Sequence, residues 1–273
     1  ALFRFVPGAI DHHNVQILLG AGGLILLPRA LTSTRLAPLA GGMLGLGLVI
    51  GYEALVLTFL ALGVAALFAA FVRDLRHGFA TLVAACALAV AAGFVGTKLP
   101  AQWWPVDCDG LGLNLVGLTG VGALTLVALQ RFAPRSGPLT WLAGLAAGGA
   151  VAAGTYVAIA PACLAGPFAG MDPRAAEIWL NAVIEVKSLL EYSASDPKVA
   201  VAYFVVTGAA LAILAHVLWR RPTPATGLEF ALVLIATAYG CIFVRLVPYA
   251  IWMTIPVTAA WIAGRQGSAG VSP

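Results

Sequence analysis

Four polar residues, Asp11-His12-His13-Asn14, lie directly before the first long apolar stretch of the chain. A carboxylate and an imidazole two positions apart, as in Asp11 and His13, can both bind a divalent cation. The plainer interpretation is that these residues begin a helix, where an aspartate caps free N–H groups and interacts favourably with the helix dipole. The four residues by themselves do not separate a metal site from a helix start.

Two further ionisable residues lie among apolar neighbours. Glu185 follows Ala182-Val183-Ile184 in a long polar segment and is either a solvated acid or part of a site. Arg245 lies near the end of an apolar stretch, where it would either reach toward lipid headgroups or bind a phosphate through its guanidinium fork. Glu53 is a fourth ionisable group of this kind, and the sequence gives it no partner.

The four cysteines divide into two pairs. Cys86 and Cys241 lie inside apolar stretches, where cysteine packs as a small apolar residue. Cys108 and Cys163 lie in segments between such stretches. They are either two unrelated thiols or a disulfide that would pin the long polar segment, because sequence alone does not reveal the Cα spacing that a disulfide requires.

The composition indicates which elements must position these residues. Of the 273 residues, 61% are hydrophobic and only 10% are charged, and the mean hydropathy is +0.98. Soluble domains carry about 25% charged residues, so this chain has too few to cover a water-exposed surface. In a bilayer the apolar side chains face lipid and the backbone polar groups pair within helices. The sequence therefore predicts an all-α, polytopic transmembrane helical bundle.

Nine apolar stretches have about the length needed to cross the hydrocarbon core. The stretch at 36–72 is expected to form two spans, with one long tilted helix as the alternative. The nine predicted spans are 14–28, 36–52, 54–72, 79–97, 111–130, 139–160, 199–219, 227–246 and 249–264.

The basic residues indicate an orientation. If the nine spans alternate, five basic clusters fall on one side, which the positive-inside rule makes cytoplasmic. The N-terminal segment, the loop 98–110 and the loop 161–198 then lie outside. We expect one transmembrane domain at 1–264, with 161–198 as its external loop and 265–273 as a disordered tail. The clusters are Arg29 with Arg35, Arg73 with Arg76 and His77, Arg131 with Arg135, Arg220 with Arg221, and Arg265.

With this order of elements, the polar motifs resemble those of one family. Pro7-Gly8-Ala9-Ile10-Asp11-His12-His13 is similar to the second acidic motif in the catalytic subunit of oligosaccharyltransferases, and Ala182-Val183-Ile184-Glu185 is similar to the Ser-Val-Ser-Glu motif of their external loop. Arg245 lies where those enzymes have an arginine that contacts the donor phosphate. The chain thus resembles membrane glycosyltransferases of the GT-C superfamily, including their fold.

The resemblance implies a function and a site. The substrate would be a sugar donor linked to polyprenyl phosphate, used at the periplasmic face of a bacterial inner membrane. Asp11 and His13 would bind Mg²⁺ or Mn²⁺, Arg245 would bind the donor phosphate, and Glu185 would be the catalytic-site acid that helps to hold the metal or the acceptor. Family members also have an acidic first external loop and a C-terminal soluble domain. Neither matches anything in this chain, so we expect it to be part of a longer enzyme or a relative that kept the scaffold.

Two other functions agree with the composition. A non-catalytic scaffold or accessory subunit, with other membrane subunits as partners, would suit the Gly- and Ala-rich spans. A transporter or lipid flippase would be expected to carry more charges within its spans and paired broken helices. The sequence contains no phosphate-binding glycine motif and no Cys-x-x-Cys pair, and its few basic clusters do not form a nucleic-acid footprint. The expected partners are therefore lipids and lipid-linked sugars and not nucleic acid.

Overall fold

The protein is helical throughout the part of the chain that the structure describes. The computed structural model describes residues 12–166, 169, 171, 172, 174, 175, 177, 178 and 187–269, and these contain no β-strand. The helices are α1 (His12–Ala30), α2 (Leu36–Ile50), α3 (Leu55–Phe71), α4 (Leu75–Thr97), α5 (Leu113–Phe132), α6 (Pro138–Ile159), α8 (Leu189–Ser195), α9 (Pro197–Arg220), α10 (Pro224–Ile242) and α11 (Val247–Ala269). Short 3₁₀ turns lie at η2 (Pro100–Gln102), η3 (Pro161–Ala165) and η5 (Val244–Leu246).

Six of these helices are long and apolar enough to cross a membrane, so the chain is a multi-pass membrane protein. They are α4, α5, α6, α9, α10 and the Val244–Gly264 segment that includes most of α11. Each of the nine predicted spans coincides with a long helix. The helices α2 and α3, however, are shorter apolar helices, and α1 is not among the six, so nine crossings remain a prediction.

Local sequence signals explain where several helices begin. Pro138, Pro197 and Pro224 occupy first-turn positions, where the missing N–H costs nothing and the fixed φ already suits a helix. The hydroxyl of Thr223 accepts a hydrogen bond from the Thr226 N–H and caps α10. The predicted division of 36–72 into two helices is confirmed, because Gly51 is fully extended between α2 and α3.

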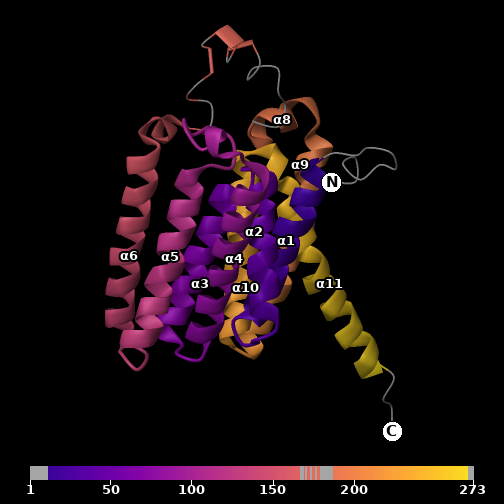
Figure 1. Ribbon diagram of the computed structural model, residues 1–273. Coiled ribbons are helices and arrows are strands. Elements are labelled where there is room, and N and C mark those ends of the chain that lie inside the picture. The colour runs from indigo at the N-terminus through magenta and orange to yellow at the C-terminus, as the bar shows by residue number, and fades with distance from the viewer. Residues whose placement is uncertain are drawn as a thin grey trace.

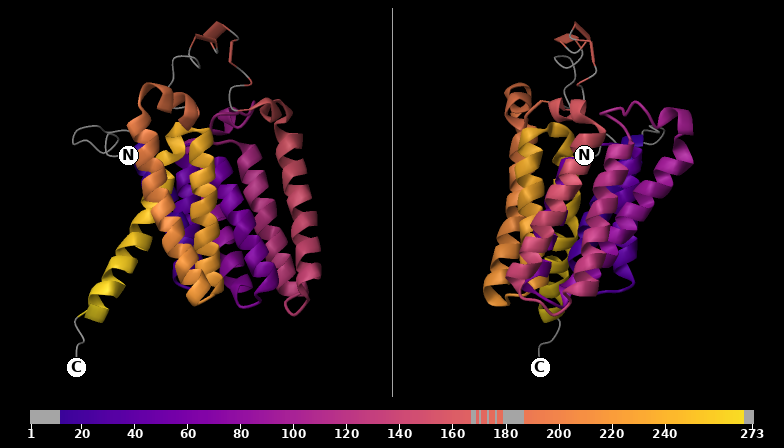
Figure 2. Two further views of the ribbon diagram at one scale, coloured as in Figure 1. Left: turned by 180° about the vertical axis from the view of Figure 1, so that it is seen from behind. Right: turned by 60° about the vertical axis from the view of Figure 1, so that its left-hand side comes forward.

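The long helices pack side by side and connect alternately at two ends (Figures 1 and 2). We call one the arginine end; its connections are 31–35, 72–74, 133–137 and 221–223. We call the other the disulfide end; it carries the N-terminal start of α1, the connections 51–54, 98–112 and 243–246, and the described residues of 160–196. The chain extends past the predicted domain boundary as a helix, since α11 continues through Ala269 into the predicted tail.

The two ends differ in charge. The arginine end has two acids, Asp74 and Glu229, against nine arginines: Arg29, Arg35, Arg73, Arg76, Arg131, Arg135, Arg220, Arg221 and Arg265. In the described part of the disulfide end, by contrast, five basic residues face seven acidic ones. This charge distribution agrees with the predicted orientation, in which the arginine end faces the cytoplasm.

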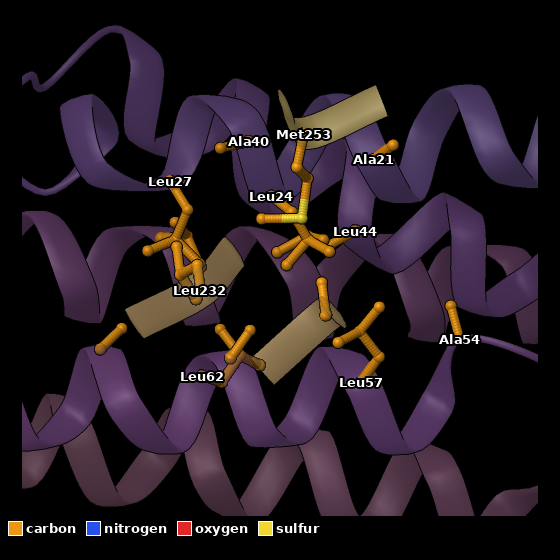
Figure 3. Close-up of a cluster of buried hydrophobic side chains, with 14 of the residues drawn as sticks. Ala21, Leu24, Leu27, Ala40, Leu44, Ala54, Leu57, Leu62, Leu232 and Met253 are labelled. Atoms are coloured by element: carbon orange, nitrogen blue, oxygen red, sulfur yellow. The ribbon is translucent and has the colours of Figure 1, made fainter. Parts of the chain in front are cut away.

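The core is apolar and packed through small residues. Leucines of α1, α2, α3 and α10 meet Met253 of α11 in a buried cluster (Figure 3). α2 lies against α4 so closely that a Cβ on Gly45 would come within 2.5 Å of the Cys86 carbonyl oxygen. By contrast, α6 lies at the edge of the bundle (Figure 1) and buries only 6% of its membrane window.

Candidate functional site

The start of α1 and the turn between α2 and α3 meet at the disulfide end. His13 Nε2 lies 2.7 Å from Glu53 Oε1, and the two side chains are 20% and 12% exposed. The contact is an ion pair when His13 is protonated and a hydrogen bond when it is neutral. Glu53, which the sequence left without a partner, therefore faces the histidine that the sequence assigned to a metal site. The His12 and His13 rings lie 3.9 Å apart between centroids.

Gln16 fixes this turn against α1. Its side chain is 1% exposed, and its Nε2 donates a hydrogen bond of 2.7 Å to the Gly51 carbonyl oxygen. A Cβ on Gly51 would lie 2.7 Å from Gln16 Oε1, so any larger residue here would displace the Gln16 amide from its present position. Because Gln16 follows His13 by three residues, both lie on the same helical face. The chain thereby holds Glu53 next to His13.

Gln16 has a second polar atom that is buried. Its Oε1 forms no hydrogen bond with any described residue. A buried acceptor without a partner costs about 1–3 kcal/mol, so such an atom usually marks a bound group or water. The sequence analysis missed Gln16, although a glutamine three residues after His13 on an otherwise apolar face was a usable signal.

Arg245 lies in η5, between α10 and α11, at the same end. The side chain is half-buried, its guanidinium carbon lies 5.7 Å from the Phe243 ring centroid, and its Nε is buried without a hydrogen-bond acceptor among the described residues. α11 packs on α1, where Tyr249 lies against Gly20. His13 thus lies in α1 and Arg245 in the turn that leads into the neighbouring helix α11, and both lie toward the same end of the bundle.

The polar loop reaches η5 through α8. The Val244 N–H donates to the Lys187 carbonyl oxygen over 3.0 Å, and α8 begins directly afterwards. Ser188 caps α8: its hydroxyl accepts from the Glu191 N–H, and Glu191 Oε2 accepts from the Ser188 N–H and hydroxyl. These hydrogen bonds lower the pKa of Glu191. The backbone of Lys187, two residues after Glu185 in the sequence, is therefore held next to Val244, the residue before Arg245.

A disulfide closes the other side of this end. Cys108 and Cys163 are bonded, with their Cα atoms 5.1 Å apart, so the bridge that the sequence left open is present. Nearby, Tyr52 faces the Gly112 backbone and Tyr156. Burial is the main cause that raises the pKa of Tyr52, and the charge of the Tyr156 phenolate is a smaller one.

The predicted site residues are only partly described. Asp11 and Glu185 lie outside the described residues. His13 and Arg245 lie at the disulfide end, and His13 is joined by two residues without a predicted role, Glu53 and Gln16. Among the described side chains no cluster of three or more His, Cys, Asp or Glu could hold a metal ion. The metal-site prediction for Asp11 and His13 therefore stays a prediction.

Comparisons with protein-family models, with curated proteins and with solved structures found no match to this chain. The assignment of function consequently depends on the geometry and charge of the site itself.

Proposed function

We propose that this chain is a GT-C-like membrane glycosyltransferase, or the larger part of one, that uses a polyprenyl-phosphate-linked sugar at its disulfide end. The observation that carries the proposal is the pairing of His13 with Glu53 beside the buried, unsatisfied Gln16 Oε1. Imidazole, carboxylate and amide oxygen are ligands that Mn²⁺ and Mg²⁺ accept. The concentration of arginines at the opposite end favours a periplasmic location for this end in a bacterial inner membrane.

His13, Glu53 and Gln16 would hold the divalent cation, with Asp11 as a further ligand. His13 and Gln16 come from one helical face, and the Gln16–Gly51 hydrogen bond brings the Glu53 carboxylate to them. A cation held there would offset negative charge on the departing phosphate. The chain thus supplies oxygen and nitrogen donors from two separate elements.

Arg245 would bind the donor phosphate. Its Nε has no protein acceptor among the described residues, and a guanidinium binds phosphate oxygens through two parallel hydrogen bonds. The backbone hydrogen bond between Val244 and Lys187 brings a second basic residue into the same part of the fold, and its side chain would add positive charge for the same phosphate. Glu185, in the adjoining loop, would help to hold the cation or the acceptor.

A second candidate function is that of a non-catalytic subunit in a larger membrane assembly. The nearly unburied α6 favours it, because Gly149 and Gly154 of that helix have no neighbouring atoms where a Cβ would be. A partner helix could approach such a face closely. The binding experiments below separate the two candidates, since a scaffold would not require the polar site.

The metal half of the proposal is tested by Mn²⁺ binding to the purified chain in detergent, followed by electron paramagnetic resonance. We expect one Mn²⁺ site in the parent. His13→Ala should remove it, and Glu53→Gln should lower the Mn²⁺ affinity at least about tenfold, because loss of a ligand or of its hydrogen-bonded partner has an effect of this size. His77→Ala, at the arginine end, is the matched control and should bind as the parent does. No binding by the folded parent would exclude the metal site and favour the scaffold.

The donor half is tested with a polyprenyl phosphate titrated into the same protein. Arg245→Gln should weaken its binding about tenfold or more, because a charge-assisted pair contributes about 1.5–3 kcal/mol. Lys198→Gln replaces another cation of the disulfide end and should leave binding unchanged. Turnover is measured as polyprenyl phosphate released from the sugar-linked donor. Equal binding by the parent and Arg245→Gln would contradict the assigned role.

A further inference from the structure

Two adjoining cavities open at the arginine end, far from the proposed site. One has a volume of about 370 Å³ and lies between α1, α9, α10 and α11. The other, of about 430 Å³, lies between α9 and α11 and ends at Gly264. Val217, Ala260 and Trp261 line both, so the cavities form one groove, which we call the α9–α11 groove.

The groove exists because α11 separates from its neighbours. In Figures 1 and 2 the C-terminal part of α11 leans away from the bundle, while its N-terminal part packs among the other helices. Pro256 lies inside α11 and lines the groove. A proline removes one main-chain hydrogen bond and so allows a helix to bend. The groove therefore lies between the C-terminal part of α11 and the rest of the bundle.

Its inner wall is apolar. The part of the groove farthest from the arginines is lined by apolar side chains, namely Ile25, Leu214, Pro256 and Val257. A cavity with such a lining at membrane depth suits a hydrocarbon chain, because it offers no hydrogen bonds to water.

Its mouth is cationic. Arg29, Arg220 and Arg221 line the groove, and Glu229 is the one acid among the described residues that do so. Arg29 and Glu229 line the same cavity. Neither Arg220 nor Arg221 forms an ion pair with a described carboxylate, and both are exposed. Two positive charges are thus in excess, and an anion at the mouth would neutralise them.

Aromatic residues place this mouth at the level of the headgroups. Trp219 is 87% exposed next to Arg220, and Trp261 meets His216 edge to face with centroids 5.5 Å apart. Tryptophan is enriched where the acyl region meets the headgroups. The first turn of α10, including Thr226, also faces the groove, and its helix dipole favours a negative charge there.

We infer that the α9–α11 groove binds an anionic phospholipid of the leaflet at the arginine end. Its phosphodiester lies against Arg220 and Arg221, and one acyl chain lies between α11 and the α1–α9 wall. Basic pockets between helices on the cytoplasmic side are typical sites for anionic headgroups. The inference is independent of the proposed function, since none of these residues belongs to the disulfide end.

The test is a lipid-binding experiment on the full chain in a neutral detergent, in which native mass spectrometry measures the bound lipid. Dioleoylphosphatidylglycerol and dioleoylphosphatidylcholine are titrated separately. We expect the parent to retain phosphatidylglycerol preferentially, and Arg220→Gln/Arg221→Gln to lose roughly tenfold or more of that affinity. Glycerol phosphate at the same concentration should not compete, because it lacks the acyl chain that fills the groove.

Two further variants complete the design. Arg131→Gln/Arg135→Gln removes two cations of the same end outside the groove and should bind as the parent does. Ala260→Phe fills the groove without changing charge and should also reduce retention, which keeps the test decisive if the double arginine variant does not fold. Equal retention of both lipids by the parent, unchanged binding by Ala260→Phe, or an equal loss in the control would each overturn the inference.

Discussion

At the scale of single residues, Arg76 is the cation that the fold encloses most completely. Its side chain is 2% exposed, and its guanidinium donates to the carbonyl oxygens of Ala69 and Ala70 at the end of α3 and of Ser136 in the α5–α6 connection. The same group lies 4.4 Å from the Trp141 ring centroid. A single side chain thus ties α3, α4 and α6 together at the arginine end.

We predict that Arg76→Ala destabilises the protein by about 3 kcal/mol or more, because it leaves buried carbonyl groups without donors and removes a cation–π contact. The free energy of unfolding in mixed micelles measures the effect. Arg73→Ala is the matched control, since Arg73 is exposed in the α3–α4 connection, three residues before Arg76, and should change stability by less than about 0.5 kcal/mol. Equal effects of the two substitutions would contradict the role of Arg76.

The residue contacts of the candidate site could be predicted only in part. A polar run before an apolar stretch indicated where His13 would lie, and a cation near a span end indicated Arg245. The pairing of His13 with Glu53 joins residues forty positions apart and depends on how the α2–α3 turn folds back. Hydrophobic patterns contain no such information, and Arg76, for the same reason, was read only as a topology signal.

At the scale of elements, glycine positions decide how closely helices approach. On α2, a Cβ at Gly45 would meet the Cys86 carbonyl oxygen at 2.5 Å and the Ala89 Cβ at 2.7 Å, whereas a Cβ at Gly42 would meet nothing within 4 Å. Both glycines belong to one short helix, so they differ in their neighbours and not in their backbone.

Gly45→Ala is therefore expected to lower the free energy of unfolding by about 1–3 kcal/mol through overpacking against α4. Gly42→Ala should be neutral or slightly stabilising, because alanine is the better helix former and its methyl group enters open space. The two variants are compared by unfolding in the same micelles. A loss at Gly42 as large as that at Gly45 would show that helix propensity, and not the α2–α4 contact, controls the result.

Helix positions were the most predictable feature of the fold. The bilayer sets span length, and lipid-facing backbone must be helical, so each predicted apolar run coincides with a helix, and six of these helices are long and apolar enough to span. Elements of the polar loop were less predictable. The short helix α8 depends on the capping pair of Ser188 and Glu191, and no apolar period marks it.

At the scale of the whole molecule, charge separates the two ends and predicts the orientation. In a Cys86→Ser/Cys241→Ser background, Asp109→Cys should react with an impermeant maleimide added to intact cells. Thr34→Cys and Ser136→Cys, at the arginine end, should react only after the membrane is permeabilised. The reverse pattern would invert the orientation and move the proposed donor site to the cytoplasmic face. Labelling of Thr34→Cys and Ser136→Cys from opposite sides would contradict the alternation of the helices.

The whole-molecule arrangement also separates two lipid environments. The proposed donor site lies at the disulfide end, and the α9–α11 groove opens at the other. A substitution in either site should leave binding at the other unchanged, because stability effects of distant, independent sites are additive.

The disulfide has a consequence for how the chain is made. Cys108 and Cys163 flank α5 and α6. In the predicted orientation they would reach the same oxidising compartment only after this helical hairpin has crossed the membrane in both directions. In that orientation, the Cys108–Cys163 disulfide can form only after both α5 and α6 have been inserted. The disulfide would also keep the α5–α6 hairpin in place. Its second helix, α6, is the least buried of the six long apolar helices. The disulfide formed during biosynthesis would thus link the end of α6 covalently to the segment before α5, at an edge of the bundle where α6 buries little surface.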